Sequence, residues 1–291
     1  MTTYRVTHRT SYTYDGDVSA SFGRAHLLPS DRTRQTCTDA ALLITPTPDE
    51  QLEHADAFGN RSTYFSVTTP HRALTVLAES TVTVAPTGVP RAPAWENVRD
   101  DLRSALAPAH LDARGYVLPS PRLVPHPDVT AYAHASFPPG RPLADATLDL
   151  AARIHRDFRY ASGSTTVRSS PADLLTGGEG VCQDFAHLAV AALRSLGLAA
   201  RYVSGYLETR PPPGRPRLLG ADASHAWVSV FTGEGWFDVD PTNDRVVDDT
   251  FVELAHGRDY ADVPPLRGVI FSDGSESVLT VAVDMIRLDD G

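Results

Sequence analysis

The sequence contains no lysine: all 26 of its basic residues are arginines, in a chain of 291 residues. Without lysine, the protein cannot form a Schiff base to a carbonyl substrate or to pyridoxal phosphate. A phosphate-binding loop that depends on its lysine is excluded for the same reason, as is a lysine acting as general base. Glutamine is also scarce and occurs only as Gln35, Gln51 and Gln183.

Positive charge, long apolar runs and cysteine are limited as well. The 36 acidic residues give a formal net charge of -10, which argues against binding to nucleic acid or to an anionic membrane. No apolar stretch approaches the roughly 20 residues that cross a bilayer, and the polar N-terminus lacks the apolar core of a secretory signal. Cys37 and Cys182 are expected to be reduced thiols. The sequence therefore predicts a cytoplasmic protein with no nucleic-acid or membrane partner.

Alternating side chains predict a β-rich N-terminal domain over residues 1–90. Tyrosine, valine and threonine occupy most even positions of residues 4–14, as on one face of a strand. The Asp-Gly-Asp sequence at residues 15–17 is a turn signal. Further strand candidates lie at residues 41–45, 63–68 and 74–85.

Prolines and helical spacing divide the rest of the chain. Pro86, Pro90 and Pro93 mark the domain edge, and residues 91–142 are predicted to form a Pro-rich and helical connecting region. Residues 143–291 are predicted to form the core domain. This core opens with an amphipathic helix at residues 143–158 and closes with a strand at residues 278–288.

Cys182 lies where a glycine-rich turn meets a predicted helix. Gly177, Gly178 and Gly180 precede it, and apolar residues at helical spacing follow it as far as Gly197. Backbone N–H groups and the helix dipole at such a start favour a thiolate, and they suit an oxyanion formed by nucleophilic attack. The alternative is a small buried hydrophobic side chain, the usual role of a free cysteine. Catalysis requires a base and a group that orients it.

The nearest histidine is a poor partner for this cysteine. His187 follows Cys182 by five residues, which places it about 140° around the helix, so we interpret it as a structural or surface residue. His225 begins an alternating strand that is followed by a Gly-rich hairpin signal at residues 232–235. His225 is therefore the better candidate for the base.

The hairpin register selects a carboxylate for His225. A loop of two or four residues pairs Phe231 with Trp236, which places Trp227 opposite Asp240. Because side chains alternate along a strand, His225 and Asp240 then share one face as diagonal neighbours, roughly 7–8 Å apart at the backbone. A loop of three residues would reverse the parity and separate them.

Two alternative interpretations remain open. His225 could be an ordinary histidine of an edge strand, and Asp240 could belong to an ordinary turn, which its proline and asparagine neighbours suit. A metal site made of Cys182, His187, His225 and Asp240 is disfavoured, because no CxxC, HxxxH or HExxH spacing occurs.

Three segments in this region resemble one known family. GEGVCQDFAHLAVAALRSLGLAARYVSGYL, SHAWVSV and GWFDVDPTND follow one another as in the core of the transglutaminase-like superfamily, whose cysteine enzymes are related in fold to papain-like proteases. The resemblance covers residues 143–244. It implies Cys182 as the nucleophile, His225 as the base and Asp240 as the orienting acid.

The N-terminal segments add to the resemblance. YRVTHRTSYTYDGDV, FGNRSTYF and ALTVLAESTVTV are similar to the β-rich region that precedes this core in many bacterial members. The implied fold class is α+β: a papain-like or transglutaminase-like core, in which the helix bearing the nucleophile packs on an antiparallel sheet, after a β-rich domain.

The resemblance implies thiol-dependent acyl transfer on amide or peptide bonds. We expect hydrolysis, as in a cysteine protease or amidase; the alternatives are a protein-glutamine amine acyltransferase and a non-catalytic binding module on the same scaffold. No calcium loop or cofactor motif occurs, so we expect no cofactor and no metal, and no oligomeric state follows from the sequence.

Two details of the expected site are less specific. The backbone N–H of Cys182 is the expected oxyanion donor, with Tyr160 and Ser164 as weaker candidates. Three arginines, Arg210, Arg215 and Arg217, occupy a Pro-rich loop before the histidine strand. A solvated loop is the favoured interpretation for them over selection of an acidic substrate.

Overall fold

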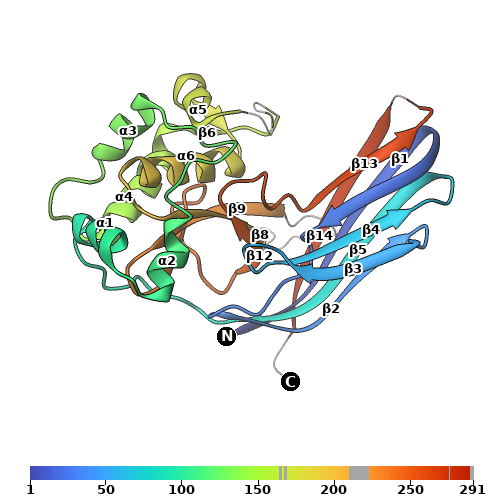
Figure 1. The fold of residues 1–291 in the computed structure, drawn as a ribbon, viewed down its shortest axis with the longest axis horizontal. Coiled ribbons are helices and arrows are strands. Elements are labelled where there is room, and N and C mark those ends of the chain that lie inside the picture. Colours follow the sequence, from blue (N-terminus) through green and yellow to red (C-terminus); the bar gives the residue numbers. More distant parts are fainter. Residues whose placement is uncertain (164–165, 167–168, 210–222, 275, 289–291) are drawn as a thin grey trace, which may run out of the picture.

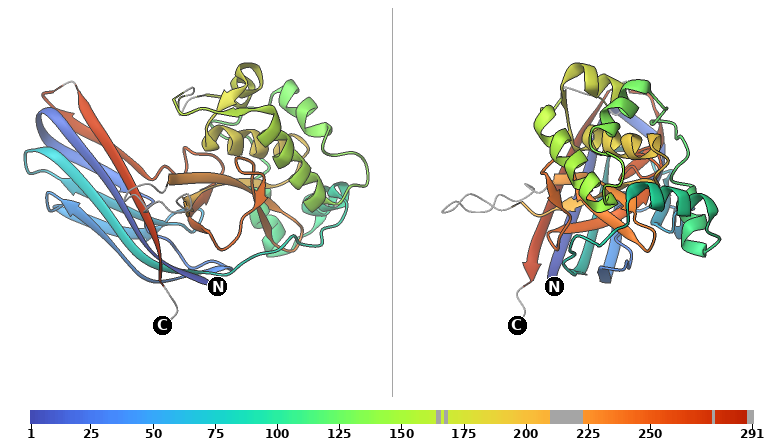
Figure 2. Two further views of the ribbon diagram at one scale, coloured as in Figure 1. Left: turned by 180° about the vertical axis from the view of Figure 1, so that it is seen from behind. Right: turned by 90° about the vertical axis from the view of Figure 1, so that its left-hand side faces the viewer.

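The computed structural model describes residues 1–163, 166, 169–209, 223–274 and 276–288. In this part of the chain, strands form a seven-stranded sheet, a five-stranded sheet and a short two-stranded sheet. Figure 1 shows the larger sheet and the helices at opposite ends of the molecule, with the five-stranded sheet between them. The view from behind in Figure 2 shows the same order. None of the helices that the structure describes is long and apolar enough to cross a membrane.

Strand β1 (Thr2–Ala25) organises the larger sheet. Its first half pairs with β5 (His71–Val84) and β14 (Ser277–Leu288), and its second half pairs with β4 (Arg61–Val67) and β13 (Leu266–Ser272). The partners change near the predicted turn at residues 15–17, where the strand continues but its register with β5 shifts. Two outer strands complete the sheet: β2 (Gln35–Thr45) on β5 and β3 (Glu50–Ala55) on β4.

The two C-terminal strands differ from the predicted domain boundaries. The sequence analysis placed residues 143–291 in one core, but β13 and β14 both pair with β1 in the N-terminal sheet. Val283 and Met285 of β14 are buried in an apolar cluster with Tyr4 and Val6. Alternation predicts that a segment forms a strand but not which strand it pairs with, and β1 offers a free edge to each of these two strands.

The five-stranded sheet has the order β11-β10-β9-β8-β12. Its strands are β8 (Ala200–Leu207), β9 (Ala223–Phe231), β10 (Trp236–Asp240), β11 (Arg245–Val246) and β12 (Phe251–Gly257). Tyr206 and Val252 of this sheet pack against Tyr4 and Val84 of the larger sheet. The two sheets are therefore joined through a shared apolar cluster.

The described chain contains six helices, and those at residues 143–157 and 182–195 pack on the five-stranded sheet. The six helices are α1 (Trp95–Ser104), α2 (Pro108–Arg114), α3 (Pro127–His134), α4 (Leu143–Asp157), α5 (Pro171–Gly177) and α6 (Cys182–Ser195). The bounds of α4 and α6 confirm the two helices that apolar spacing predicted. In α6, Phe185, Ala189 and Leu193 are buried in one cluster with side chains of β8, β9 and β10, among them Tyr202 and Val228. The apolar face of α6 thus holds its first residue against the sheet.

Candidate active site

Cys182 is the first residue of α6 and is half-buried. The preceding short strand β7 (Glu179–Gly180) pairs in parallel with β6 (Arg159–Tyr160), and the N–H of Ala161 donates to the carbonyl of Gly180 at 3.0 Å. A side chain at position 180 would lie 3.0 Å from the Asp184 side chain, so the close approach of the turn to the helix depends on glycine there. These contacts fix the entry of the chain into α6.

The first turn of α6 supplies a favourable setting for negative charge at Cys182. The N–H of Val181 donates to the buried carboxylate of Asp184 at 2.8 Å, which caps the helix. The N–H of Asp184 donates to the carbonyl of Val181 at 2.9 Å. The N–H groups of Cys182 and Gln183, the first two residues of the helix, come too early to bond a carbonyl one turn back within it. Together with the helix dipole, such groups stabilise an anion that forms in front of the helix.

The hairpin that carries His225 has the predicted register. Phe231 pairs with Trp236 and Val228 pairs with Val239, and the N–H of Thr232 closes the loop by donating to the carbonyl of Gly235 at 2.8 Å. The loop therefore has the even parity on which the pairing of His225 with Asp240 depends. The local signals of a Gly-containing hairpin were sufficient to fix this register.

His225 and Asp240 meet in a buried hydrogen bond. The Nε2 atom of His225 lies 2.8 Å from Oδ2 of Asp240, and the side chains are 7% and 0% exposed. The N–H groups of Thr242 and Asn243 donate to Oδ1 of the same carboxylate at 2.8 and 3.3 Å. The amide of Asn243 donates to Oδ2 at 2.6 Å. The carboxylate is thus held in one orientation from several sides.

These hydrogen bonds keep the pair charged. Burial disfavours the carboxylate of Asp240, but the bonds from His225, Asn243 and Thr242 outweigh burial and lower its pKa. Burial likewise disfavours the imidazolium of His225. Hydrogen bonds and attraction from Asp240 and Cys182 outweigh that effect and raise the pKa of His225 to about 10.

The side chain of Cys182 lies near His225, because it is among the causes that raise the pKa of the histidine. Nε2 of His225 is bonded to Asp240, so Nδ1 is the ring nitrogen that remains for a partner other than Asp240. Trp227 and Phe251 border the ring, with centroids 6.4 and 5.9 Å from that of His225. The structure therefore brings Cys182, His225 and Asp240 together in the order that the sequence analysis predicted.

His187 is not part of the group formed by Cys182, His225 and Asp240. It is 1% exposed, and its Nε2 atom accepts a hydrogen bond from the N–H of Tyr260 at 3.2 Å. Burial lowers the pKa of His187 to about 4, which keeps the ring neutral. The position of His187 agrees with a structural role.

Among the described residues, no group of three or more His, Cys, Asp or Glu side chains is placed to hold a metal ion.

Two neighbours of the site bear on the less specific expectations. Tyr160 is 53% exposed. Its pKa is raised first by burial and next by the charge of Cys182, so Tyr160 and Cys182 lie near each other.

The sequence analysis missed Asn243, although this residue lies in the GWFDVDPTND segment, because an asparagine after a strand is an ordinary turn residue. Ser164 and the loop arginines Arg210, Arg215 and Arg217 lie outside the described residues.

Comparison with known families gives two matches in this chain. The family model described as "Transglutaminase-like superfamily" matches residues 132–241, which include Cys182, His225 and Asp240. The family model described as "Bacterial transglutaminase-like N-terminal region" matches residues 4–83, which form most of the larger sheet.

Relatives and a solved structure match over nearly the whole chain. An uncharacterized protein of Mycobacterium bovis is 46% identical over 98% of this chain and 93% of its own. An uncharacterized protein of Mycobacterium leprae is 34% identical over 98% of each chain. The crystal structure of a Cytophaga hutchinsonii protein, described as a candidate cysteine protease, superposes with a TM-score of 0.76 at 23% identity, covering 100% of this chain and 92% of that one.

Proposed function

Because this chain belongs to the transglutaminase-like superfamily, we propose that it is a thiol enzyme that transfers acyl groups from amide or peptide bonds. In this proposal Cys182 is the nucleophile, His225 the acid and base, and Asp240 the carboxylate that orients the histidine. The observation that supports it best is the buried 2.8 Å contact between His225 and Asp240, beside a cysteine that opens a helix. A buried histidine and carboxylate on one face of a hairpin contribute little to the stability of the fold, so a purely structural role explains them poorly.

The reaction would begin from a Cys182 thiolate and a His225 imidazolium. The sulfur attacks the carbonyl carbon of the amide, and backbone N–H groups at the start of α6 stabilise the oxyanion. The imidazolium then gives its Nδ1 proton to the leaving nitrogen, the C–N bond breaks, and a thioester to Cys182 remains. Water loses a proton to His225 as it attacks the thioester, which releases a carboxylic acid and restores the thiolate–imidazolium pair.

We propose water, rather than an amine, as the usual acyl acceptor. The fold shared with the Cytophaga hutchinsonii protein, described as a candidate cysteine protease, favours hydrolysis. The test incubates the protein with a glutamine-containing peptide and a labelled primary amine, with Cys182→Ala as the control. We expect release of ammonia and a glutamate-containing peptide, with less amine incorporation than hydrolysis.

The outcomes separate the alternatives. Amine incorporation that exceeds hydrolysis would identify a protein-glutamine amine acyltransferase instead. If a panel of peptides and cell extract leaves no acyl mass adduct on Cys182 and no product above the Cys182→Ala control, the chain is a non-catalytic binding module.

Alkylation of the two cysteines provides a direct check on the thiolate–imidazolium pair. At pH 6, iodoacetamide is expected to modify Cys182 at least about tenfold faster than Cys37, because only a thiolate reacts. Cys37 is the internal reference: burial raises its pKa, and its sulfur donates to the carbonyl of Asp39 at 3.4 Å. Mass spectrometry of Cys182→Ser and Cys37→Ser proteins measures each rate separately. Equal rates would contradict the ion pair.

Asn243 is proposed to position Asp240, so Asn243→Ala is expected to lower kcat/KM by about 10- to 100-fold through kcat. The amide of Asn243 also helps to lower the pKa of Asp240, so its loss should move the acidic limb of the pH profile to higher pH. A merely structural effect would lower activity without that shift. Asn97→Ala, at an exposed position of α1, is the matched control and should change neither quantity.

The enzyme is proposed to act in the cytoplasm on peptide or amide substrates. Cys37 and Cys182 are both free thiols in the structure, the form that a reducing compartment maintains. Fractionation of cells that produce the protein tests the location: we expect it with cytoplasmic markers, and recovery with exported proteins would contradict the proposal.

A further inference from the structure

A pocket that the proposed thiol chemistry does not use lies between the five-stranded sheet and the chain at residues 32–34 and 87–90. Its volume is about 720 Å3, which is in the range of sites for small organic molecules. On the side of the sheet, its lining includes Arg201 of β8, Trp236 and Asp238 of β10, and Glu253 and His256 of β12. Charged side chains are therefore prominent on this wall.

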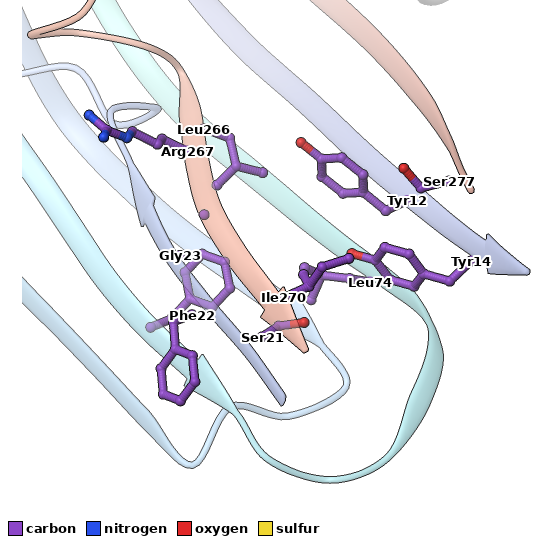
Figure 3. Close-up of a pocket in the computed structure, with 12 residues that line it drawn as sticks. Tyr12, Tyr14, Ser21, Phe22, Gly23, Leu74, Leu266, Arg267, Ile270 and Ser277 are labelled. Atoms are coloured by element: carbon purple, nitrogen blue, oxygen red, sulfur yellow. The ribbon is translucent and has the colours of Figure 1, made fainter. Parts of the chain in front are cut away.

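A smaller pocket in the larger sheet differs in character. Figure 3 shows this pocket, which has a volume of about 180 Å3 and mostly aromatic and aliphatic walls. Its arginine, Arg267, is exposed, and the guanidinium points away from Tyr12 and Tyr14. Arg201 of the larger pocket is instead partly buried, and neighbouring side chains hold its guanidinium.

A chain of hydrogen bonds orients the guanidinium of Arg201. The carboxylate of Glu253 accepts from Nε of Arg32 at 3.1 Å and from Nδ1 of His256 at 2.7 Å. Burial lowers the pKa of His256, so the ring is neutral and its Nε2 is an acceptor. Nη1 of Arg201 donates to this nitrogen at 3.1 Å, and the guanidinium lies over the ring of Trp236, 4.0 Å from its centroid. Arg201 is thus held by neutral partners, which do not compensate its charge.

One edge of this guanidinium has no partner. Nη2 of Arg201 forms no hydrogen bond with the part of the chain that the structure describes, and Nε is buried without one. Elsewhere in this chain, the same two nitrogens hold one carboxylate each in Arg61, Arg258 and Arg287, at 2.6–3.0 Å. Arg201 therefore presents the edge that binds carboxylates here, without a carboxylate on it.

The charges around the pocket leave this arginine uncompensated. Within the described ranges, no carboxylate oxygen lies within 4.0 Å of its guanidinium nitrogens. Glu234, which also lines the pocket, is exposed, so solvent screens its charge. The two other arginines of the wall have acidic partners: Arg32 lies 3.1 Å from Glu253, and Arg34 lies 3.7 Å from Asp238. A partly buried cation without a counterion is costly, and an anion in the pocket would remove that cost.

We propose that this pocket binds the carboxylate of a small organic acid, with its two oxygens on Nε and Nη2 of Arg201. The planar fork of arginine matches the two oxygens of a carboxylate. The single uncompensated charge matches a monoanion, whereas a phosphate group carries more than one charge at neutral pH. The hydrocarbon part of the acid would lie against Pro90 and Trp236, which line the same pocket. The inference is independent of the reaction at Cys182.

Calorimetric titration with matched probes tests the proposal. 3-Phenylpropionate and 4-phenylbutan-2-one share a ring and chain, but the second carries a methyl ketone in place of the carboxylate. We expect 3-phenylpropionate to bind with a Kd below about 5 mM and at least about tenfold more tightly than the ketone, because hydrogen bonds to a charged group distinguish them. Inorganic phosphate, the third probe, should bind at least about threefold more weakly than 3-phenylpropionate, and tighter binding of phosphate would contradict a carboxylate site.

Substitution of Arg201 locates the binding. Arg201→Gln removes the charged fork and should weaken 3-phenylpropionate at least about tenfold. Arg5→Gln is the matched control, because it changes the net charge equally at an exposed position of β1, and it should bind like the parent protein. Unchanged binding in Arg201→Gln would overturn the proposal.

A second pair of variants changes the wall without touching the arginine. Ala109 lines the pocket from α2 and is exposed, so this pair remains informative even if Arg201→Gln does not fold. Ala109→Trp fills space at the wall and should weaken 3-phenylpropionate at least about tenfold, whereas Ala109→Ser should match the parent protein. Equal affinities for the acid and the ketone, equal binding by both Ala109 variants, or no binding of 3-phenylpropionate would each overturn the proposal.

Discussion

Replacement of Asp240 by asparagine is expected to lower kcat/KM for amide hydrolysis by about 10^3- to 10^4-fold. Asparagine can still accept a hydrogen bond from His225, but it has no charge to hold the ring as an imidazolium. Asp240 is fully buried beside the histidine, so solvent cannot replace the missing charge. Steady-state kinetics on the peptide substrate of the hydrolysis test would measure the loss.

The pH profile separates this mechanism from a loss of folded protein. The raised pKa of His225, about 10, keeps the ring protonated through neutral pH, so activity should be lost only as pH rises through about 10. In Asp240→Asn the main cause of the raised pKa is gone, and the alkaline limb should move down toward the ordinary histidine value of about 6.5. An alkaline limb that stays at the same pH in this variant would contradict the role given to Asp240.

Asp238 provides the matched control for this substitution. It lies on the same strand and the same face as Asp240, two residues away, and pairs with Ser229 rather than His225. Asp238→Asn should therefore leave the alkaline limb in place and change kcat/KM by less than about threefold. A loss as large as that of Asp240→Asn would show that any buried carboxylate on this strand has the same effect.

Gly205→Ala is expected to destabilise the protein by at least about 3 kcal/mol. An added Cβ would lie 2.1 Å from the carbonyl oxygen of Val252 and 2.5 Å from a ring carbon of Trp227. Backbone cannot give way as a flexible side chain does, so β8 and β12 would have to separate. Gly205 also pairs with His225, and the displaced strand should slow alkylation of Cys182.

The control is another glycine of the same sheet. At Gly235 in the hairpin, an added Cβ has no neighbour within 4 Å. Gly235→Ala should change the free energy of unfolding by less than about 1 kcal/mol. Denaturant unfolding of both variants measures the difference. A loss below about 1 kcal/mol in Gly205→Ala would mean that the sheet relaxes more easily than its close contacts suggest.

Local signals predicted two geometric features of the candidate site, the hairpin register and the start of α6. The hairpin around Gly233 and Gly235 fixed the strand register, and with it the face shared by His225 and Asp240. The glycines before Cys182 and the helical spacing after it located the start of α6. Each of these features depends on residues within a few positions of one another, where backbone geometry and side-chain alternation leave few choices.

The elements that depend on distant partners were not predictable in the same way. Alternation identified a strand at the C-terminus, but its pairing with β1, far away in the chain, followed from the free edge that β1 offers. The pairing of Gly23 with Gly268 likewise exists only because β13 lies beside β1. Asn243 had an ordinary turn sequence, and its role became visible only in its 2.6 Å contact with Asp240.

The sequence alone showed that the chain has no lysine, and it thereby excluded Schiff-base chemistry. The sequence also determined which cysteine begins a helix and which aspartate shares a face with His225, because both are consequences of local periodicity. Only the tertiary structure decided that Cys182 lies near His225. Helix α6 and strand β9 are far apart in the chain, and burial of the apolar face of α6 on the sheet brings them together.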